Sequence, residues 1–147
     1  MKFKSFLFVV CFSLFTNVFA ANTHVHPKAD IADKKSITKN VTYPGYCEIE
    51  IINASYTDIK VFGTFDDGAS ISFDIYRYES PHYISLYYAN NYGDYWCHSR
   101  MYLTIQSPFY TVYSGWTNVD STIRIVPYLK NGLKQNSKQA KAEVTTR

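Results

Sequence analysis

Apolar and polar residues alternate along the middle of the chain with the period of two that is typical of β-strands. In residues 47–53, Cys47, Ile49 and Ile51 would share one face, with Glu48 and Glu50 on the other. Similar alternation or short apolar runs recur in residues 58–65, 70–78, 83–88, 101–106, 109–116 and 121–127. No helical period lies between these segments, so the pattern predicts an all-β protein.

Turn-forming residues separate the predicted strands at intervals of about eight to twelve residues. Asp66-Asp67-Gly68 is typical of a hairpin turn, while Ser80-Pro81 and Ser107-Pro108 end strands. Gly63, inside the strand predicted for residues 58–65, is a candidate bulge. Seven or eight short antiparallel strands with this spacing predict a single small β-sandwich, and a small β-barrel is the alternative.

The first twenty residues have the pattern of a cleaved export signal. Lys2 and Lys4 precede an apolar run from Phe6 to Phe15, and Ala20 is a small residue suited to the cleavage position. The run is too short to cross a bilayer, so we expect no transmembrane anchor. The sequence therefore predicts a secreted or periplasmic protein that loses residues 1–20, Cys11 included.

Composition and charge change on either side of the aromatic middle of the chain. All 14 Tyr lie between Tyr43 and Tyr128, and residues 43–127 carry four basic against nine acidic side chains. The flanks are rich in Lys, Asn, Gln and Thr, which is typical of solvated tails. We expect a flexible segment at 21–42, a β-sandwich domain at 43–129 and a basic flexible tail at 130–147.

Two cysteines remain once the predicted export signal is removed. In an oxidising compartment Cys47 and Cys97 can pair only with each other within the chain. We therefore expect one disulfide that closes a loop of about fifty residues and contributes roughly 4 kcal/mol to stability.

Catalytic and metal chemistry are not expected. His98 is the neighbour of Cys97 on a predicted strand, so the two side chains would point to opposite faces and could not act as a nucleophile and base. Asp66 and Asp67 fit a solvated turn better than a catalytic carboxylate pair. His24 and His26 lie in the predicted flexible segment, where two imidazoles make only a weak metal site. We expect no enzyme activity, no catalytic residues, no metal and no cofactor.

Outward-facing aromatic residues are the strongest indication of function. Rings with a polar tip suit sugar faces or the centre of a protein interface, although cross-strand Tyr pairs can also simply stabilise a solvent-facing sheet. The candidate binding residues are Tyr76, Tyr78, Tyr83, Tyr87, Tyr92, Tyr95, Trp96 and Tyr102. They favour an exported module that binds a glycan or a protein partner, and no nucleic acid is expected.

A second hypothesis is an inhibitor of a secreted or periplasmic hydrolase. Residues 89–94 would then form a rigid loop that enters the active site of the target enzyme, with little loss of conformational entropy on binding.

Overall fold

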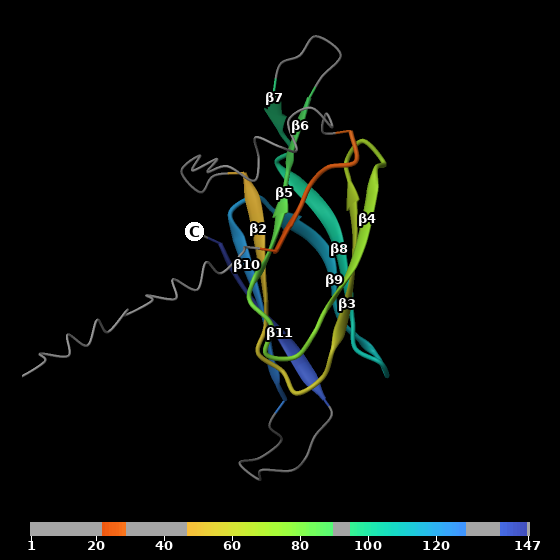
Figure 1. Cartoon of the computed structure of the whole chain (residues 1–147), viewed down its shortest axis with the longest axis vertical. Helices are drawn as coiled ribbons and strands as arrows, with labels where there is room; N and C mark the ends of the chain where they lie inside the picture. The colour runs from red at the N-terminus through yellow and green to blue at the C-terminus, as the bar shows by residue number, and fades with distance from the viewer. Residues whose placement is uncertain (1–21, 29–46, 90–94, 129–138, 147) are drawn as a thin grey trace, which may run out of the picture.

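The chain folds into a β-sandwich, seen in a computed structural model that describes residues 22–28, 47–89, 95–128 and 139–146 (Figure 1). The predicted export signal at 1–20 lies outside the described residues. One sheet has the strand order β1-β5-β2-β10-β11, formed by β1 (Asn22–His24), β5 (His82–Ser85), β2 (Glu48–Asn53), β10 (Ser121–Pro127) and β11 (Ala140–Thr146). The other has the order β4-β3-β8-β9, formed by β4 (Ser70–Ile75), β3 (Ile59–Phe65), β8 (Arg100–Gln106) and β9 (Thr111–Asn118). Strands β6 (Tyr87–Ala89) and β7 (Tyr95–Cys97) form a separate two-stranded hairpin.

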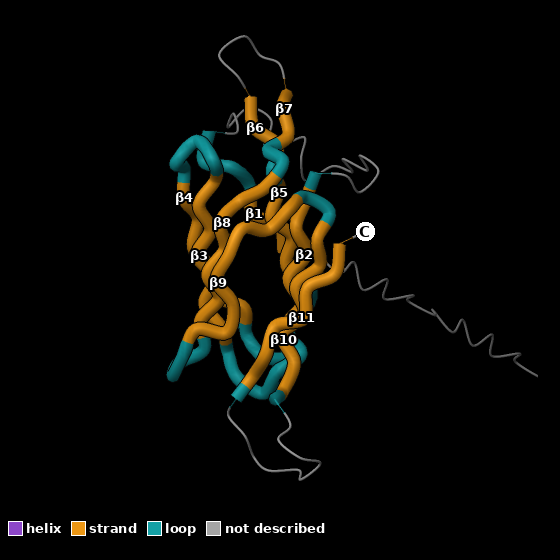
Figure 2. The backbone as a smooth tube through the Cα atoms, turned by 180° about the vertical axis from the view of Figure 1, so that it is seen from behind, coloured by secondary structure: helices purple, strands orange, loops and turns teal. Residues whose placement is uncertain are grey.

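The two large sheets face each other, and the hairpin β6-β7 projects beyond one end of the sandwich (Figures 1 and 2). The predicted fold class is thereby confirmed, with sheets that end in edge strands rather than closing on themselves. Eleven strands occur among the described residues instead of the seven or eight expected. Within the same ranges, no helix has the length and hydrophobicity needed to span a membrane.

The core lies between the sheets and follows from the alternation in the sequence. On β2 and β3, residues alternate strictly between buried and more exposed positions, so one row of side chains from each strand enters the core. Each fully buried Ile, Leu, Val or Met side chain contributes about 1.5 to 3 kcal/mol to the stability of the fold. The fully buried apolar side chains are Ile49, Ile51, Val61, Ile75, Ile84, Leu86, Met101, Leu103, Ile105, Ile123 and Ile125.

Parts of both predicted tails belong to the sandwich, which corrects the expected domain limits. β1 pairs in parallel with β5, and β11 pairs antiparallel with β10 over seven residues. Ala140 is buried opposite Pro127, while Val144 at the far end of β11 remains 47% exposed. Edge strands are held mainly by backbone hydrogen bonds, which polar sequences form as readily as apolar ones. The rest of the predicted tails, residues 21, 29–42, 130–138 and 147, lies outside the described residues.

Gly63 is not a bulge. It pairs regularly with Ile71 on one side and Leu103 on the other, in the middle of β3. A Cβ atom there would collide with the terminal methyl group of Met101, so glycine makes room for a core side chain. The irregularity in the described sheets lies instead between Ile105 and Gln106, where β8 pairs with β9.

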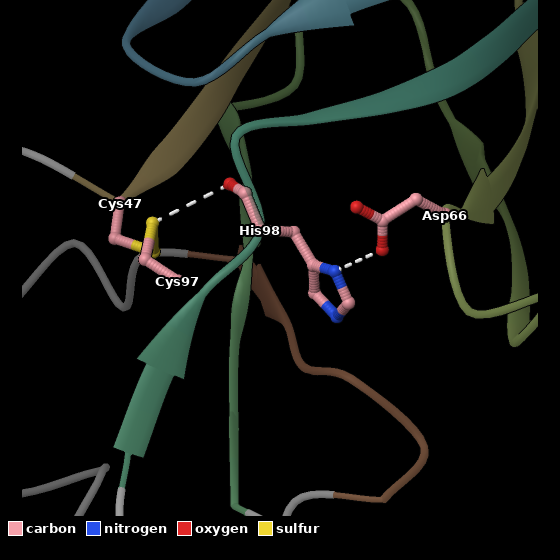
Figure 3. The surroundings of a disulfide bond; sticks show 4 residues. All are labelled: Cys47, Asp66, Cys97 and His98. Carbon is pink, nitrogen blue, oxygen red and sulfur yellow. Dashed lines mark hydrogen bonds and ion pairs between the residues drawn. A yellow bond between two sulfur atoms is a disulfide. The ribbon is translucent and has the colours of Figure 1, made fainter.

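The predicted disulfide is confirmed. Cys47 and Cys97 are bonded with an S–S distance of 2.01 Å and a Cα–Cα distance of 5.9 Å (Figure 3). Cys47 immediately precedes β2 and is buried, whereas Cys97 ends β7 and is exposed. The bond therefore ties the projecting hairpin to the five-stranded sheet.

Replacing both cysteines by Ala should lower the free energy of unfolding by about 4 kcal/mol, because the bond closes a long loop and restricts the unfolded chain. Urea unfolding followed by tryptophan fluorescence measures the difference. Reduction of the unmodified chain with dithiothreitol is the matched control and should give a similar loss. An unchanged midpoint in both experiments would contradict a stabilising role for the bond.

Candidate functional site

Three exposed aromatic side chains lie on adjacent strands of the outer surface of the four-stranded sheet. Phe62 on β3, Tyr102 on β8 and Trp116 on β9 are 37%, 39% and 51% exposed. Their strands are neighbours in the order β3-β8-β9. We call Phe62, Tyr102 and Trp116 the aromatic face.

Direct pairing brings two of these rings together. Tyr102 is opposite Trp116 in the β8-β9 ladder, and their rings meet edge to face with centroids 5.6 Å apart. The Arg100 guanidinium lies over the Trp116 ring, 4.7 Å from its centroid, and Lys60 lies 5.4 Å from the centroid of Phe62. Cation–π contacts of this exposed kind contribute about 0.5 to 1 kcal/mol each.

Hydroxyl groups accompany the aromatic face. Ser114 Oγ lies 3.0 Å from the Tyr102 hydroxyl and 3.3 Å from Thr104 Oγ1, and Thr64 Oγ1 lies 3.5 Å from Ser70 Oγ. Each hydroxyl can both donate and accept hydrogen bonds. The outer surface of this sheet therefore combines flat apolar rings with adaptable polar groups.

Of the eight aromatic residues predicted from the sequence, Tyr102 alone belongs to the aromatic face. Tyr76 and Tyr78 are 60% and 75% exposed on the connection between β4 and β5, and Tyr78 has a left-handed φ of 63°. Tyr83 lies on the outer surface of the other sheet, where its hydroxyl donates to Glu50 Oε1 at 3.1 Å. These residues do not form one surface with Tyr102.

The remaining predicted residues are near the projecting hairpin. Tyr87 is half-buried against the core, and Trp96 is 56% exposed on β7. Tyr92 and the side chain of Tyr95 lie outside the described residues. Phe62 and Trp116 were not predicted as binding residues. The alternation places Phe62 on the outward face of its strand, but it does not show which side chains lie beside Phe62 on neighbouring strands.

Histidines form a second concentration of functional groups, at the end of the sandwich near the disulfide. Residues 22–28 place His24 and His26 against the body of the protein, so they are not part of a flexible tail. His26, His82 and His98 are only 0%, 4% and 4% exposed. We call His24 and His82 the His24–His82 pair, and His26, Asp66, Asp67 and His98 the His26–His98 cluster.

The His24–His82 pair fixes β1 to the sandwich. His24 Nε2 and His82 Nδ1 are 2.8 Å apart, and His82 Nε2 lies 3.4 Å from Glu79 Oε2. The His24 ring also stacks on Phe73 with a centroid distance of 3.4 Å. Burial, together with the nearby His82, lowers the pKa of His24 to about 4 despite the opposing influence of Glu79.

In the His26–His98 cluster, Asp67 is shared between His26 and Lys28. Asp67 Oδ1 lies 3.4 Å from His26 Nε2, and Asp67 Oδ2 lies 2.8 Å from Lys28 Nζ. The Lys28 ammonium and the Ala69 backbone N–H hold the pKa of Asp67 well below its usual range. Burial lowers the pKa of His26, although its hydrogen bond with Asp67 opposes the shift.

His98 completes the cluster from the other side. Its Nδ1 contacts Asp66 Oδ1, and its ring points away from the disulfide toward that carboxylate (Figure 3). Its Nε2 is buried without a hydrogen-bond partner among the described residues. Asp66 and Asp67 form the predicted hairpin turn, in which Asp67 Oδ1 accepts from the Ala69 N–H at 2.9 Å. Each carboxylate also faces a histidine, a contact that could not be predicted from the residue pattern.

The chain was compared with protein-family models, with curated proteins and with solved structures, and no significant match was found. Its function is therefore inferred from its own residues and their geometry.

The titration of His24 predicts that acid weakens the fold. The unfolded chain takes up a proton near pH 6.5, while folded His24 resists protonation until about pH 4, so the free energy of unfolding should fall as pH decreases across this window. His24→Phe keeps a ring on Phe73 but cannot titrate, and its stability should vary less with pH. Thermal unfolding at several pH values measures both chains. Equal pH dependence in the two would exclude His24 as the source.

Proposed function

We propose that the protein is an exported binding module whose aromatic face contacts a glycan. The observation that carries this proposal is the alignment of Phe62, Tyr102 and Trp116 on three neighbouring strands, all exposed. Single exposed apolar side chains are normal on protein surfaces, but a group of adjacent rings favours a ligand.

Sugar rings suit the chemistry of this surface. A pyranose presents an apolar face of C–H groups that packs on flat aromatic rings, with hydroxyls at its edge that need hydrogen-bond partners. Ser114 and Thr104 can supply such partners beside Tyr102, and the Arg100 guanidinium can donate to a sugar oxygen or a carboxylate. A protein partner is the second possibility, because Trp, Tyr and Arg are also the residues enriched in interface hot spots.

Two features support export. The first twenty residues have the pattern of a cleaved signal peptide. The disulfide between Cys47 and Cys97 is of a kind that persists in secreted or periplasmic compartments and is rare in the cytosol. A binding module outside the cytoplasm would meet polysaccharides at cell surfaces.

The alternative, an inhibitor of a hydrolase, gains no support from the described residues. Residues 90–94 of the predicted inhibitory loop lie outside them, so this function stays a prediction from the sequence.

Substitution of Trp116 separates ligand binding from stabilisation of the sheet. Trp116→Ala should weaken glycan binding at least ten-fold, about 1.4 kcal/mol. Its effect on stability should be smaller, because cross-strand pairs contribute about 0.2 to 1 kcal/mol. A glycan and polysaccharide array identifies the ligand, and titration calorimetry then compares affinities.

Trp96→Ala is the matched control, since Trp96 is similarly exposed but lies on β7, outside the aromatic face. It should leave glycan binding unchanged. A large loss of stability in Trp116→Ala without a change in affinity would contradict the proposal. If the unmodified chain binds no glycan on the array, a protein partner becomes the better hypothesis.

A further inference from the structure

The His26–His98 cluster has the composition and geometry of a metal centre. We propose that His26 Nε2, His98 Nε2 and one Asp67 carboxylate oxygen bind a first-row divalent transition metal, with Zn²⁺ the best fit. One potential ligand atom from each of His26, Asp67 and His98 lies within 4.8 Å of the other two. This inference is independent of the aromatic face and of glycan binding.

The distances are close to those a metal would require. Tetrahedral Zn²⁺ with bonds of about 2.0 to 2.1 Å separates neighbouring ligand atoms by about 3.4 Å. His26 Nε2 and Asp67 Oδ1 already lie 3.4 Å apart. Since the ligand atoms lie within 4.8 Å of one another, a contraction of at most about 1.4 Å would bring all three to this spacing, and side-chain rotation provides a movement of that size.

The unpartnered nitrogen of His98 is the observation that points most directly to a ligand. A buried polar atom without a partner is costly, so it calls for an explanation. Asp66 contacts His98 Nδ1 (Figure 3), so the buried Nε2 is the ring nitrogen that remains to take a ligand. Metal-binding histidines are commonly oriented in this way, by a carboxylate that holds the other ring nitrogen.

The ligand types indicate which metals would bind. Imidazole nitrogens suit Zn²⁺ and other first-row transition ions, whereas Ca²⁺ and Mg²⁺ prefer oxygen ligands. Two imidazoles and one carboxylate leave a coordination position open for water, which can enter because the side chain of Asp67 is 23% exposed.

Lys28 opposes the metal in two ways. Its ammonium lies 2.8 Å from Asp67 Oδ2, so it would repel a cation bound to the same carboxylate. Its backbone N–H donates to His26 Nδ1 at 3.0 Å, so the proton of neutral His26 is on Nε2. Metal binding at Nε2 would move that proton to Nδ1 and break the hydrogen bond from Lys28.

The three ligands come from separate parts of the chain. His26 follows β1, Asp67 lies in the turn between β3 and β4, and His98 follows β7. A bound metal would therefore clamp residues 22–28 to both the β3-β4 turn and the end of the projecting hairpin. It would stabilise the attachment of β1, which pairs with β5 over only three residues.

Calorimetric titration of the oxidised chain with Zn²⁺, after removal of metal with EDTA, tests the proposal. We expect one saturable site per chain, and Co²⁺ in its place should show the visible absorption of a tetrahedral complex. Asp67→Asn keeps an oxygen for the Ala69 N–H but is a poorer ligand, and should weaken Zn²⁺ binding at least about ten-fold. Asp74→Asn, at an exposed acid on β4, is the matched control and should bind as the unmodified chain does.

Lys28→Met gives a result that a nonspecific site would not. It should strengthen Zn²⁺ binding several-fold, because the competing ammonium is removed, while Lys60→Met at an exposed lysine on β3 should not. His98→Gln should eliminate the site; if that variant does not fold, Asp67→Asn and Lys28→Met still decide. Absence of Zn²⁺ binding, or equal affinities in Asp67→Asn and Asp74→Asn, would overturn the proposal.

Discussion

The junction around Leu86 is the constraint on which the His26–His98 cluster depends. The Leu86 N–H donates to the Cys47 carbonyl and its own carbonyl accepts from the His98 N–H, each at 3.0 Å. The disulfide adds a covalent link across the same junction, from Cys47 to Cys97. The backbone of His98 is thus held on two sides, and its ring is directed toward Asp66 rather than toward solvent.

This constraint also explains why one predicted strand is divided into two strands in the structure. The alternation of residues 83–88 predicts a single strand, but β5 ends at Ser85 and β6 begins at Tyr87 in a different sheet. Leu86 lies between them, fully buried, with its backbone shared by Cys47 and His98. Side-chain alternation continues through such a point, so the sequence pattern does not reveal that the hydrogen-bonding partner changes.

Much of the core could be predicted from the sequence, because burial on one face imposes a strict period of two. Alternation along β2 correctly places Ile49 and Ile51 in the core and Glu48 and Glu50 outside it. The pairing of Cys47 with Cys97 follows from the presence of only two cysteines after the predicted export signal. The edge strands could not be predicted in this way. β1 and β11 are short or polar, and backbone pairing leaves no hydrophobic period to detect.

The candidate sites were less predictable than the core, because they depend on which strands become neighbours. Outward position could be predicted for both Tyr83 and Tyr102, yet these residues lie on opposite sheets. Trp116 lies on β9, where buried and exposed positions do not alternate strictly, so its direction was not evident from alternation. His26 and His98 are separated by most of the domain, and only the topology brings their rings to a centroid distance of 5.2 Å.

One stretch of backbone connects the two sites. Arg100, which covers the Trp116 ring, begins β8 only two residues after His98. The intervening Ser99 is tied to the turn after β9 through its carbonyl, which accepts from the Val119 N–H at 2.9 Å. A metal bound at His98 would therefore act on a segment already anchored on both sides, and movement of the His98 ring need not displace Arg100. The two sites can accordingly be tested one at a time, because a substitution in either leaves the backbone supporting the other in place.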